Sequence, residues 1–356
     1  MPFDSIDCDA RLKRFDPGGN VFRVMTIDMH TAGEPLRIVT SGFPLIPGSH
    51  VIERRDYCRS QLDHLRKMLM WEPRGHADMY GCVITPPNEL AHEERADFGV
   101  LFMHNEGYSS MCGHGIIAVT KLAVESGLVA VQEPKTTVRI DAPAGRIISV
   151  ASVEKGQVVS VSFQNVPSCV ELQNQCVNVE TLGQIEFDLA YGGAYYAYVD
   201  SAQFGIDLTV ANTERLIRMG RKIKKAVQQQ YPICHPQHEE LSFLYGTVFV
   251  GPAHNPSNHS RNVCVFADGE VDRSPTGTGV SGRIAIHYAR GEVDLDETIT
   301  IESILGTTFD VAPLRETTWC SRSAVIPNVT GTASFTGRHE FWVDPDDPQR
   351  NGFLVR

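Results

Sequence analysis

The chain has 356 residues and a formal net charge of −11 at pH 7. Its length exceeds what one hydrophobic core usually supports, so we expect two domains of roughly 150 to 180 residues each. The acidic charge argues against binding to nucleic acids or anionic membranes, and no apolar run approaches the ~20 residues of a membrane span. We therefore expect a soluble protein with neither kind of partner.

The nine cysteines bear on the compartment and on metal binding. The N-terminal segment 1–15 lacks the apolar core of a signal peptide, which favours a cytoplasmic location with free thiols. No two cysteines form a C-x-x-C pair, and the four histidines from His235 to His259 lack tight ligand spacing. We expect neither a zinc nor an iron–sulfur site, and no metal.

The first half of the chain consists of short strand-like runs broken by Gly and Pro. An amphipathic helix is predicted over about 57–70, because Leu62, Leu65 and Leu69 share one stripe. A second helix is predicted over 113–126. The predicted strands are 21–27, 36–40, 81–84, 99–104, 136–141, 146–153 and 158–165.

The second half has the same texture. A basic helix is predicted over 212–229, and its Lys and Arg residues are interpreted as a solvated face. The stretch 165–184 has few periodic signals and is predicted to contain the crossover between the domains. The predicted strands are 185–190, 194–200, 244–249, 261–266, 297–302, 307–311 and 331–343.

Two segments of equal length match each other, Ser110–Gly115 and Ser274–Gly279. In each, a small nucleophilic residue (Cys112 or Thr276) precedes Gly-x-Gly, an apolar run and a terminating glycine. Each segment predicts a loop leading into a helix N-terminus, whose free N–H groups and positive dipole bind carboxylates and favour a thiolate. The repeat therefore predicts one anion site built twice. Neither Gly-x-Gly step completes a dinucleotide fingerprint, so no nicotinamide cofactor is expected.

Five ordered motifs then carry a resemblance to a known family. They are Asp28–Pro35, Arg74–Met79, Met111–Gly115, Tyr191–Gly193 and Asp272–Gly279. Together they resemble the proline racemase family from about residue 24 to 353. The resemblance implies an α/β (α+β) fold of two pseudo-symmetric domains of the diaminopimelate-epimerase type, with strands round a central helix in each and the active site in the cleft between them.

We place the first domain at 1–170, where it carries Cys112, and the second at 171–329, where it carries Asp272 and Thr276. In folds of the resembled type the final strands commonly return to the first domain. Strands from about 330 to 356 are therefore expected to join the first domain.

The resemblance implies two catalytic cysteines, one on each face of a proline-type substrate, that exchange the Cα proton without a cofactor or metal. Cys112 occupies the first position, whereas Thr276 occupies the second. A threonine hydroxyl has a pKa far above that of a thiol, so two-base racemisation should be lost. Within the family this pattern resembles the trans-3-hydroxy-L-proline dehydratases, which implies a role in hydroxyproline catabolism.

The same motif positions imply further roles. Asp272 and His114 are expected to contact the ring nitrogen of the substrate, although a turn-capping role is the alternative for Asp272. Thr276 could hydrogen-bond the substrate or fill the space of the missing thiol. The backbone N–H groups expected to stabilise the enolate-like transition state belong to Gly113, His114, Gly277 and Thr278. For His30, Thr31, Glu34, His76 and Asp78 we favour structural roles.

Three functions remain open at this stage. The first is a lyase that dehydrates trans-3-hydroxy-L-proline to Δ1-pyrroline-2-carboxylate and water, with Cys112 as the base for the Cα proton. The second is a cofactor-independent proline racemase or 4-hydroxyproline epimerase, which would need water or another cysteine as its second base. The third is a binding protein without catalysis. The expected partner is a small amino-acid substrate, and a homodimer is expected.

Overall fold

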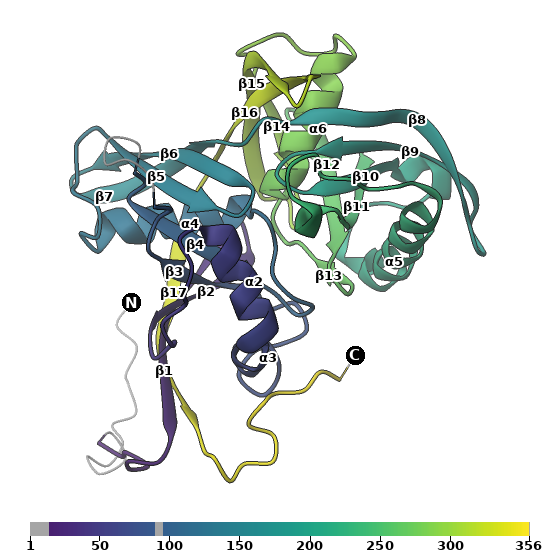
Figure 1. Cartoon of the computed structure of the whole chain (residues 1–356). Helices are drawn as coiled ribbons and strands as arrows, with labels where there is room; N and C mark the ends of the chain where they lie inside the picture. Colours follow the sequence, from purple (N-terminus) through teal and green to yellow (C-terminus); the bar gives the residue numbers. More distant parts are fainter. Residues whose placement is uncertain (1–13, 90–94, 356) are drawn as a thin grey trace.

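The computed structural model describes residues 14–89 and 95–355, and Cys8, expected to be a free thiol, lies outside these ranges. Within them, two pseudo-symmetric halves each wrap strands round a central helix (Figure 1). These helices are α4 (Gly113–Glu125) and α6 (Gly277–Ala289). Seventeen strands of the described residues form one hydrogen-bonded network. The predicted mixed α/β fold is confirmed.

The first half follows the predicted order of strands and helices. It comprises β1 (Phe22–Thr31), β2 (Glu34–Ser41), α2 (Val51–Gln61), α3 (Asp63–Met70), β3 (Gly81–Thr85), β4 (Phe98–Met103), α4, β5 (Lys135–Ala142), β6 (Gly145–Glu154) and β7 (Gln157–Gln164). Where one helix was predicted over 57–70, the structure has two, separated at Leu62. Hydrophobic periodicity misses α2 because its buried face carries Arg54 and Arg55, which bond to backbone carbonyls of Pro86 and Tyr108.

The second half begins with a strand that the sequence pattern does not predict, β8 (Cys169–Val179), inside the stretch assigned to the crossover. It continues with β9 (Gly183–Tyr191), β10 (Tyr195–Asp200), η2 (Ser201–Phe204), η3 (Val210–Asn212), α5 (Thr213–Gln230), η4 (Glu239–Leu241), β11 (Leu244–Gly251), β12 (Ser260–Phe266), β13 (Glu270–Val271), α6, β14 (Ile299–Glu302), β15 (Thr308–Trp319), β16 (Arg322–Gly331) and β17 (Ala333–Val343).

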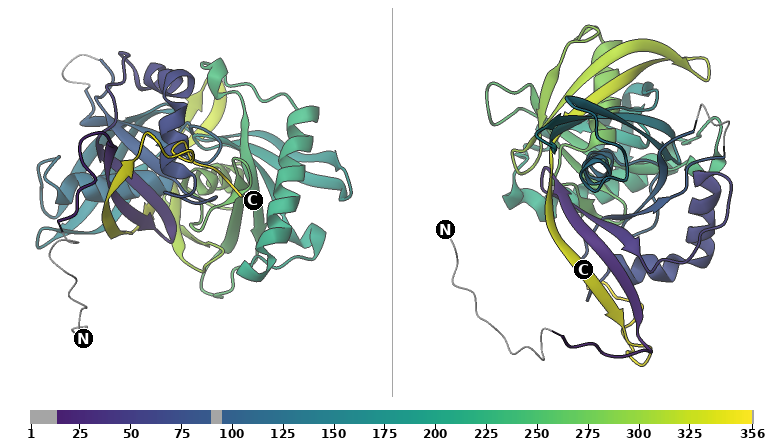
Figure 2. Two further views of the ribbon diagram at one scale, coloured as in Figure 1. Left: turned by 90° about the horizontal axis from the view of Figure 1, so that it is seen from below. Right: turned by 90° about the vertical axis from the view of Figure 1, so that its left-hand side faces the viewer.

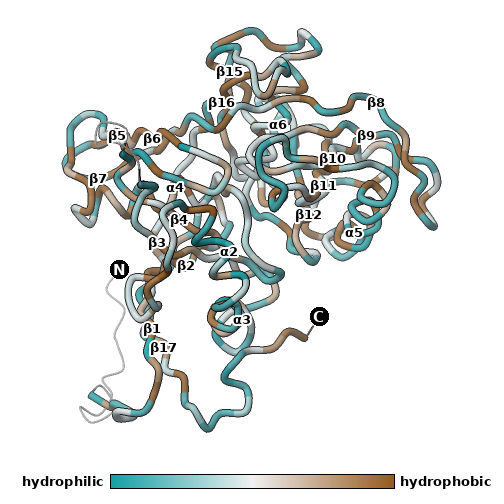
Figure 3. Tube along the Cα trace, viewed as in Figure 1, coloured by the Kyte–Doolittle hydropathy of each residue, from teal (hydrophilic) through white to brown (hydrophobic). Residues whose placement is uncertain are grey.

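Helix α5 is amphipathic in the way its sequence predicts. One stripe is buried, including Leu216, Met219, Ile223 and Val227, and much of the remaining helix is coloured as hydrophilic in Figure 3. Among the described residues, no helix combines the length and apolar character needed to cross a membrane.

The last strands connect the two halves. β16 pairs with β15 and, through Asn328–Gly331, with β7 of the first half. β17 then pairs antiparallel with β1, and the two strands run side by side as a long ribbon (Figure 2). The domain boundary near residue 170 stays a prediction.

Helix α4 is the centre of the first half. Ile116, Ile117 and Val119 have no exposed surface, and burying each such side chain contributes about 1.5–3 kcal/mol. This packing fixes the direction of α4 and aims its N-terminus at the second half. Helix α6 is similarly buried and aims its N-terminus back. The two helix starts therefore meet between the halves.

Candidate active site

A small cavity lies where the two helix N-termini meet. Its volume is about 10 Å³, which is room for about one water molecule. Its walls are Tyr80, Met111, Cys112, Gly113, His114, Tyr196, Tyr245, Phe266, Asp272, Thr276, Gly277 and Thr278. All seven residues that the sequence suggests for the site therefore line one cavity. No amino acid fits into it as it stands, so residues that line the cavity must move before a substrate binds.

Two glycines let the helix starts approach this closely. A Cβ atom on Gly113 would lie 2.5 Å from Cα of Gly277, and a Cβ on Gly277 would lie 2.5 Å from Cα of Gly113. Real Cβ atoms do not tolerate such distances from a backbone atom. The contact between the halves thus requires glycine at the first position of each Gly-x-Gly step, which is Gly113 or Gly277.

Cys112 is the N-cap residue of α4. Its Sγ accepts a hydrogen bond from the N–H of Gly115 (3.3 Å) and lies 3.2 Å from Nδ1 of His114. Burial raises the pKa of this thiol well above its usual value, and the bonds from Gly115 and the Tyr80 hydroxyl offset this only in part. The N–H of Gly115 at the helix start thus favours the thiolate, in the direction that the motif predicts, but burial outweighs this effect in the empty site.

His114 lies directly against Cys112 and is neutral. Burial lowers its pKa to about 3, and a hydrogen bond at the backbone of Pro35 counters this only in part. The imidazole packs edge to face on the ring of Tyr80, with ring centroids 4.8 Å apart. The backbone carbonyl of His114 accepts a hydrogen bond from Thr31 Oγ1 (2.8 Å), which ties β1 to the start of α4. The imidazole can therefore hydrogen-bond the Cys112 thiol, but with this lowered pKa it is a poor acceptor for the thiol proton.

Asp272 faces the cavity from the second half. Its Oδ1 accepts a hydrogen bond from the N–H of Ser274 (2.7 Å), which is the turn-capping geometry considered as the alternative. Burial raises the pKa of the Asp272 carboxyl to about 6, with Ser274 opposing the shift. The side chain thus shapes the loop before α6 and also presents a carboxyl group to the cavity.

Thr276 is the counterpart of Cys112 at the start of α6. Its φ of 70° is unusual for a β-branched residue and marks a strained backbone at a candidate functional position. Although its Oγ1 lies beside Asp272, no group of the described residues hydrogen-bonds it with good geometry. A buried hydroxyl that lines a cavity and makes no hydrogen bond of good geometry is available to a ligand.

Two residues for which we favour structural roles, Glu34 and Asp78, join the halves near this cavity. Glu34 Oε2 accepts a hydrogen bond from the N–H of Arg273 (2.7 Å), and Asp78 pairs with the Arg273 guanidinium (3.0 Å). Neither acid lines the cavity. Both hold the segment that precedes Thr276.

Tyr80 and Tyr245 line the cavity without having been predicted from the sequence. The available signal for Tyr80 was its position directly after the Arg74–Met79 motif. Tyr245 lies in a predicted strand without any motif, and only the folded chain brings it to the site.

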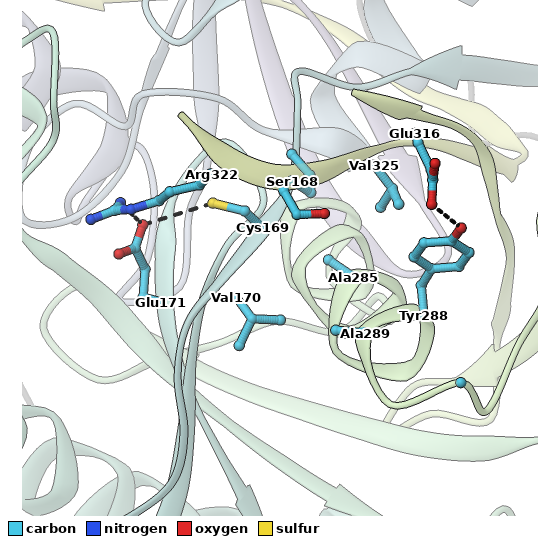
Figure 4. A pocket seen from close by; sticks show the side chains of 13 residues that line it. Ser168, Cys169, Val170, Glu171, Ala285, Tyr288, Ala289, Glu316, Arg322 and Val325 are labelled. Carbon is cyan, nitrogen blue, oxygen red and sulfur yellow. Dashed lines mark hydrogen bonds and ion pairs between the residues drawn. The ribbon is translucent and has the colours of Figure 1, made fainter. Parts of the chain in front are cut away.

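A larger pocket of about 770 Å³ lies in the second half, between β8, the β15–β16 hairpin and the C-terminal end of α6 (Figure 4). Its polar side chains bond to one another: Arg322 pairs with Glu171, and Tyr288 donates to Glu316 (2.6 Å). None of the residues suggested by the sequence lies there. In residues 14–89 and 95–355, no group of three or more His, Cys, Asp or Glu side chains is arranged to hold a metal ion.

Comparison with known proteins identifies the family to which this chain belongs. The model of the proline racemase family matches residues 26–354, and the chain belongs to this family. A protein named trans-3-hydroxy-L-proline dehydratase from Colwellia psychrerythraea is 50% identical over 333 residues, which cover 94% of this chain and 93% of that protein. A protein named 3-hydroxyproline 2-epimerase from Burkholderia multivorans is 46% identical, with 93% of this chain and 98% of that protein covered.

The fold also matches a crystal structure of a hydroxyproline epimerase from Agrobacterium vitis with bound trans-4-hydroxy-L-proline. The TM-score is 0.87 at 32% sequence identity, and the match covers 94% of this chain and 96% of that chain. Both the family resemblance and the predicted two-domain fold class are thereby confirmed.

Proposed function

We propose that this protein is a trans-3-hydroxy-L-proline dehydratase, a lyase that forms Δ1-pyrroline-2-carboxylate and water. The observation that carries the proposal is the asymmetry of the site, with one thiol (Cys112) on one helix start and a hydroxyl (Thr276) on the other. Relatives that are 45 to 50% identical over most of the chain and bear this name support it.

Stereochemistry explains why one thiol suffices. In trans-3-hydroxy-L-proline the hydroxyl and the carboxylate lie on opposite ring faces, so the hydroxyl and the Cα hydrogen share one face. A single base on that face removes the Cα proton, and the hydroxyl leaves on the same side. The opposite face, next to Thr276, needs no acid.

The carboxylate of the substrate binds between the helix starts in this proposal. The first N–H groups of an α-helix have no partner within the helix, and those of Gly113, His114, Gly277 and Thr278 border the cavity. They also stabilise the enolate-like charge that develops when the Cα proton leaves. Asp272, when ionised, holds the ring nitrogen as a cation and thereby acidifies the Cα hydrogen. The Thr276 hydroxyl lies beside the Asp272 carboxyl and the Cys264 thiol but makes no hydrogen bond of good geometry, which favours a hydrogen bond to the substrate over simple space filling.

The base is the thiolate of Cys112. In the empty site burial keeps it protonated, so we infer that the thiol loses its proton to solvent when the site opens for the substrate, where the bond from the N–H of Gly115 favours the thiolate. The thiolate takes the Cα proton, the C3–O bond breaks, and the resulting enamine tautomerises to the cyclic imine.

An epimerase is the second candidate, because the relative from Burkholderia multivorans carries such a name. Inverting Cα requires a proton donor on the face opposite Cys112. Thr276 occupies that position, and its hydroxyl is too weak an acid and base for the task at neutral pH. The geometry therefore favours elimination over inversion.

The proposed role of Cys112 is tested by replacing it with serine. General base catalysis by a positioned group typically contributes about 10²–10⁴-fold, and serine is a far weaker base, so we expect imine formation to fall by at least about 10³-fold. Cys58→Ser is a matched control, because Cys58 is also a buried thiol but lies in α2 and does not line the cavity. Substantial turnover by Cys112→Ser would refute the assignment.

A cytoplasmic location, a homodimer and a part in hydroxyproline catabolism belong to the same proposal. Cell fractionation, sedimentation and growth on trans-3-hydroxy-L-proline test these three points separately.

A further inference from the structure

The hydroxyl of Tyr80 lies beside the thiol of Cys112 and contacts several polar groups. It hydrogen-bonds Ser109 Oγ at 2.8 Å and Tyr245 Oη at 3.2 Å. It also lies close enough to Cys112 to lower the pKa of that thiol. Tyr80, Tyr245 and Cys112 line the same cavity. A phenol is thus held in a fixed direction next to the proposed base.

We propose that Tyr80 is a catalytic acid that protonates the departing 3-hydroxyl group. This inference rests on the proposed function, which places the Cα hydrogen and the hydroxyl on the face of Cys112. A hydroxide ion is a poor leaving group, so its departure requires a proton at the moment the C3–O bond breaks. The phenol of Tyr80 stands on the face where this proton is needed.

The proton transfers balance without any further reactant. The Cα proton moves to Sγ of Cys112, and the electron pair of the C–H bond becomes the Cα–C3 double bond. The C3–O pair leaves with the oxygen, which takes the proton of Tyr80 and departs as water. The Cys112 thiol returns a proton to Tyr80 Oη in the same event, so the enzyme ends with a thiolate and a neutral phenol, as it began the step.

The surroundings of Tyr80 suit a proton donor. Burial raises the pKa of its phenol well above the usual value, so the group is protonated at any working pH and the transfer must be concerted. The hydroxyls of Ser109 and Tyr245 can each donate or accept a hydrogen bond with the Tyr80 hydroxyl, and together they orient the phenol. Tyr196, the third tyrosine that lines the cavity, is instead hydrogen-bonded to Thr278 Oγ1 (2.6 Å).

A change of leaving group tests this inference. Fluoride departs with much less need for a proton than hydroxide, so trans-3-fluoro-L-proline is a probe that reports Cα deprotonation with little demand on the acid. For Tyr80→Phe we expect kcat/KM to fall by at least about 100-fold with the hydroxy substrate but by less than about 10-fold with the fluoro analogue. Tyr195→Phe is the control, because its buried phenol donates to the carbonyl of Cys234 and does not line the cavity.

Equal losses with both substrates would assign Tyr80 a merely structural role, and no loss with either would exclude any role. Both results overturn the inference, and the comparison within one variant stays valid even where the variant is less stable. Failure of the unaltered protein to form imine from the hydroxy substrate would instead overturn the proposed function, and the role of Tyr80 with it.

Discussion

Gly113 and Gly277 face each other across the two halves so closely that a Cβ on either would lie 2.5 Å from Cα of the other. Each glycine directly follows a proposed functional residue, Cys112 or Thr276. The contact therefore sets the distance between the two sides of the site. It also makes the backbone N–H groups of both helix starts face one cavity.

Gly113→Ala is predicted to separate the helix starts. The added methyl group meets backbone atoms of Gly277, which cannot move without shifting α6, so we expect a loss of about 1–3 kcal/mol in the free energy of unfolding. Misplacement by about 1 Å can cost ~10²-fold in rate, and we expect kcat/KM to fall by that order. Thermal unfolding and imine formation measure the two effects.

Gly107→Ala is the matched control, because a Cβ there meets no atom within 4 Å and its φ is not positive. Unchanged activity in Gly113→Ala would mean that the halves do not need this contact to assemble the site.

Three substitutions of Thr276 test whether its side chain hydrogen-bonds the substrate or only fills the space of the missing thiol. Thr276→Ser keeps the hydroxyl and should retain most activity, whereas Thr276→Val keeps the volume and should lose at least about tenfold in kcat/KM if the hydroxyl bonds the substrate. Thr276→Cys places a second thiol opposite Cys112, and we expect it to gain slow inversion of Cα with trans-4-hydroxy-L-proline. Full activity in Thr276→Val would instead favour the space-filling role.

The pH dependence should report the carboxyl group of Asp272. Its pKa is raised by burial from 3.8 to about 6, and the ionised form is the one that holds a cationic ring nitrogen. We therefore expect kcat/KM to fall as the pH drops below about 6, since this parameter follows the free enzyme. Asp272→Asn should lower kcat/KM strongly and abolish this limb.

The stability of the protein should respond in the opposite sense. Because the folded state holds the Asp272 proton more tightly than the unfolded state, its contribution to stability is complete below pH 3.8 and is lost as the pH rises through about 6. The loss is about 3 kcal/mol and should be absent in Asp272→Asn, as urea unfolding at pH 4 and pH 7 measures. An identical pH response in the two proteins would contradict the assigned pKa.

The sequence predicts the two central helices well because each is marked at both ends. The first starts at Gly113 as predicted and ends at Glu125, one residue early, before a glycine at 127. By contrast β16 was missed, because Pro327 interrupts its strand pattern, and the structure accommodates this residue opposite Pro313 of β15. Strand β8 was missed because it is rich in Gln and Asn and contains register shifts.

The residues of the candidate site likewise fall into those that local motifs mark and those that only the packing of the halves brings to the site. Residues within the repeated motifs, such as Cys112 and Thr276, stand directly before helix starts, so the sequence marks each of them locally. Tyr80 and Tyr245 are 165 positions apart, and their hydrogen bond depends on how the halves pack. Periodicity and capping signals contain no information on that packing.

The product formed from three related substrates tests the central claim most directly. Purified protein, without added cofactor, is incubated separately with trans-3-hydroxy-L-proline, L-proline and trans-4-hydroxy-L-proline while cyclic imine and optical rotation are followed. Our account predicts imine from the 3-hydroxy compound and no inversion of the other two. A change in rotation without imine would contradict it and would mean that a second base acts on the face of Thr276.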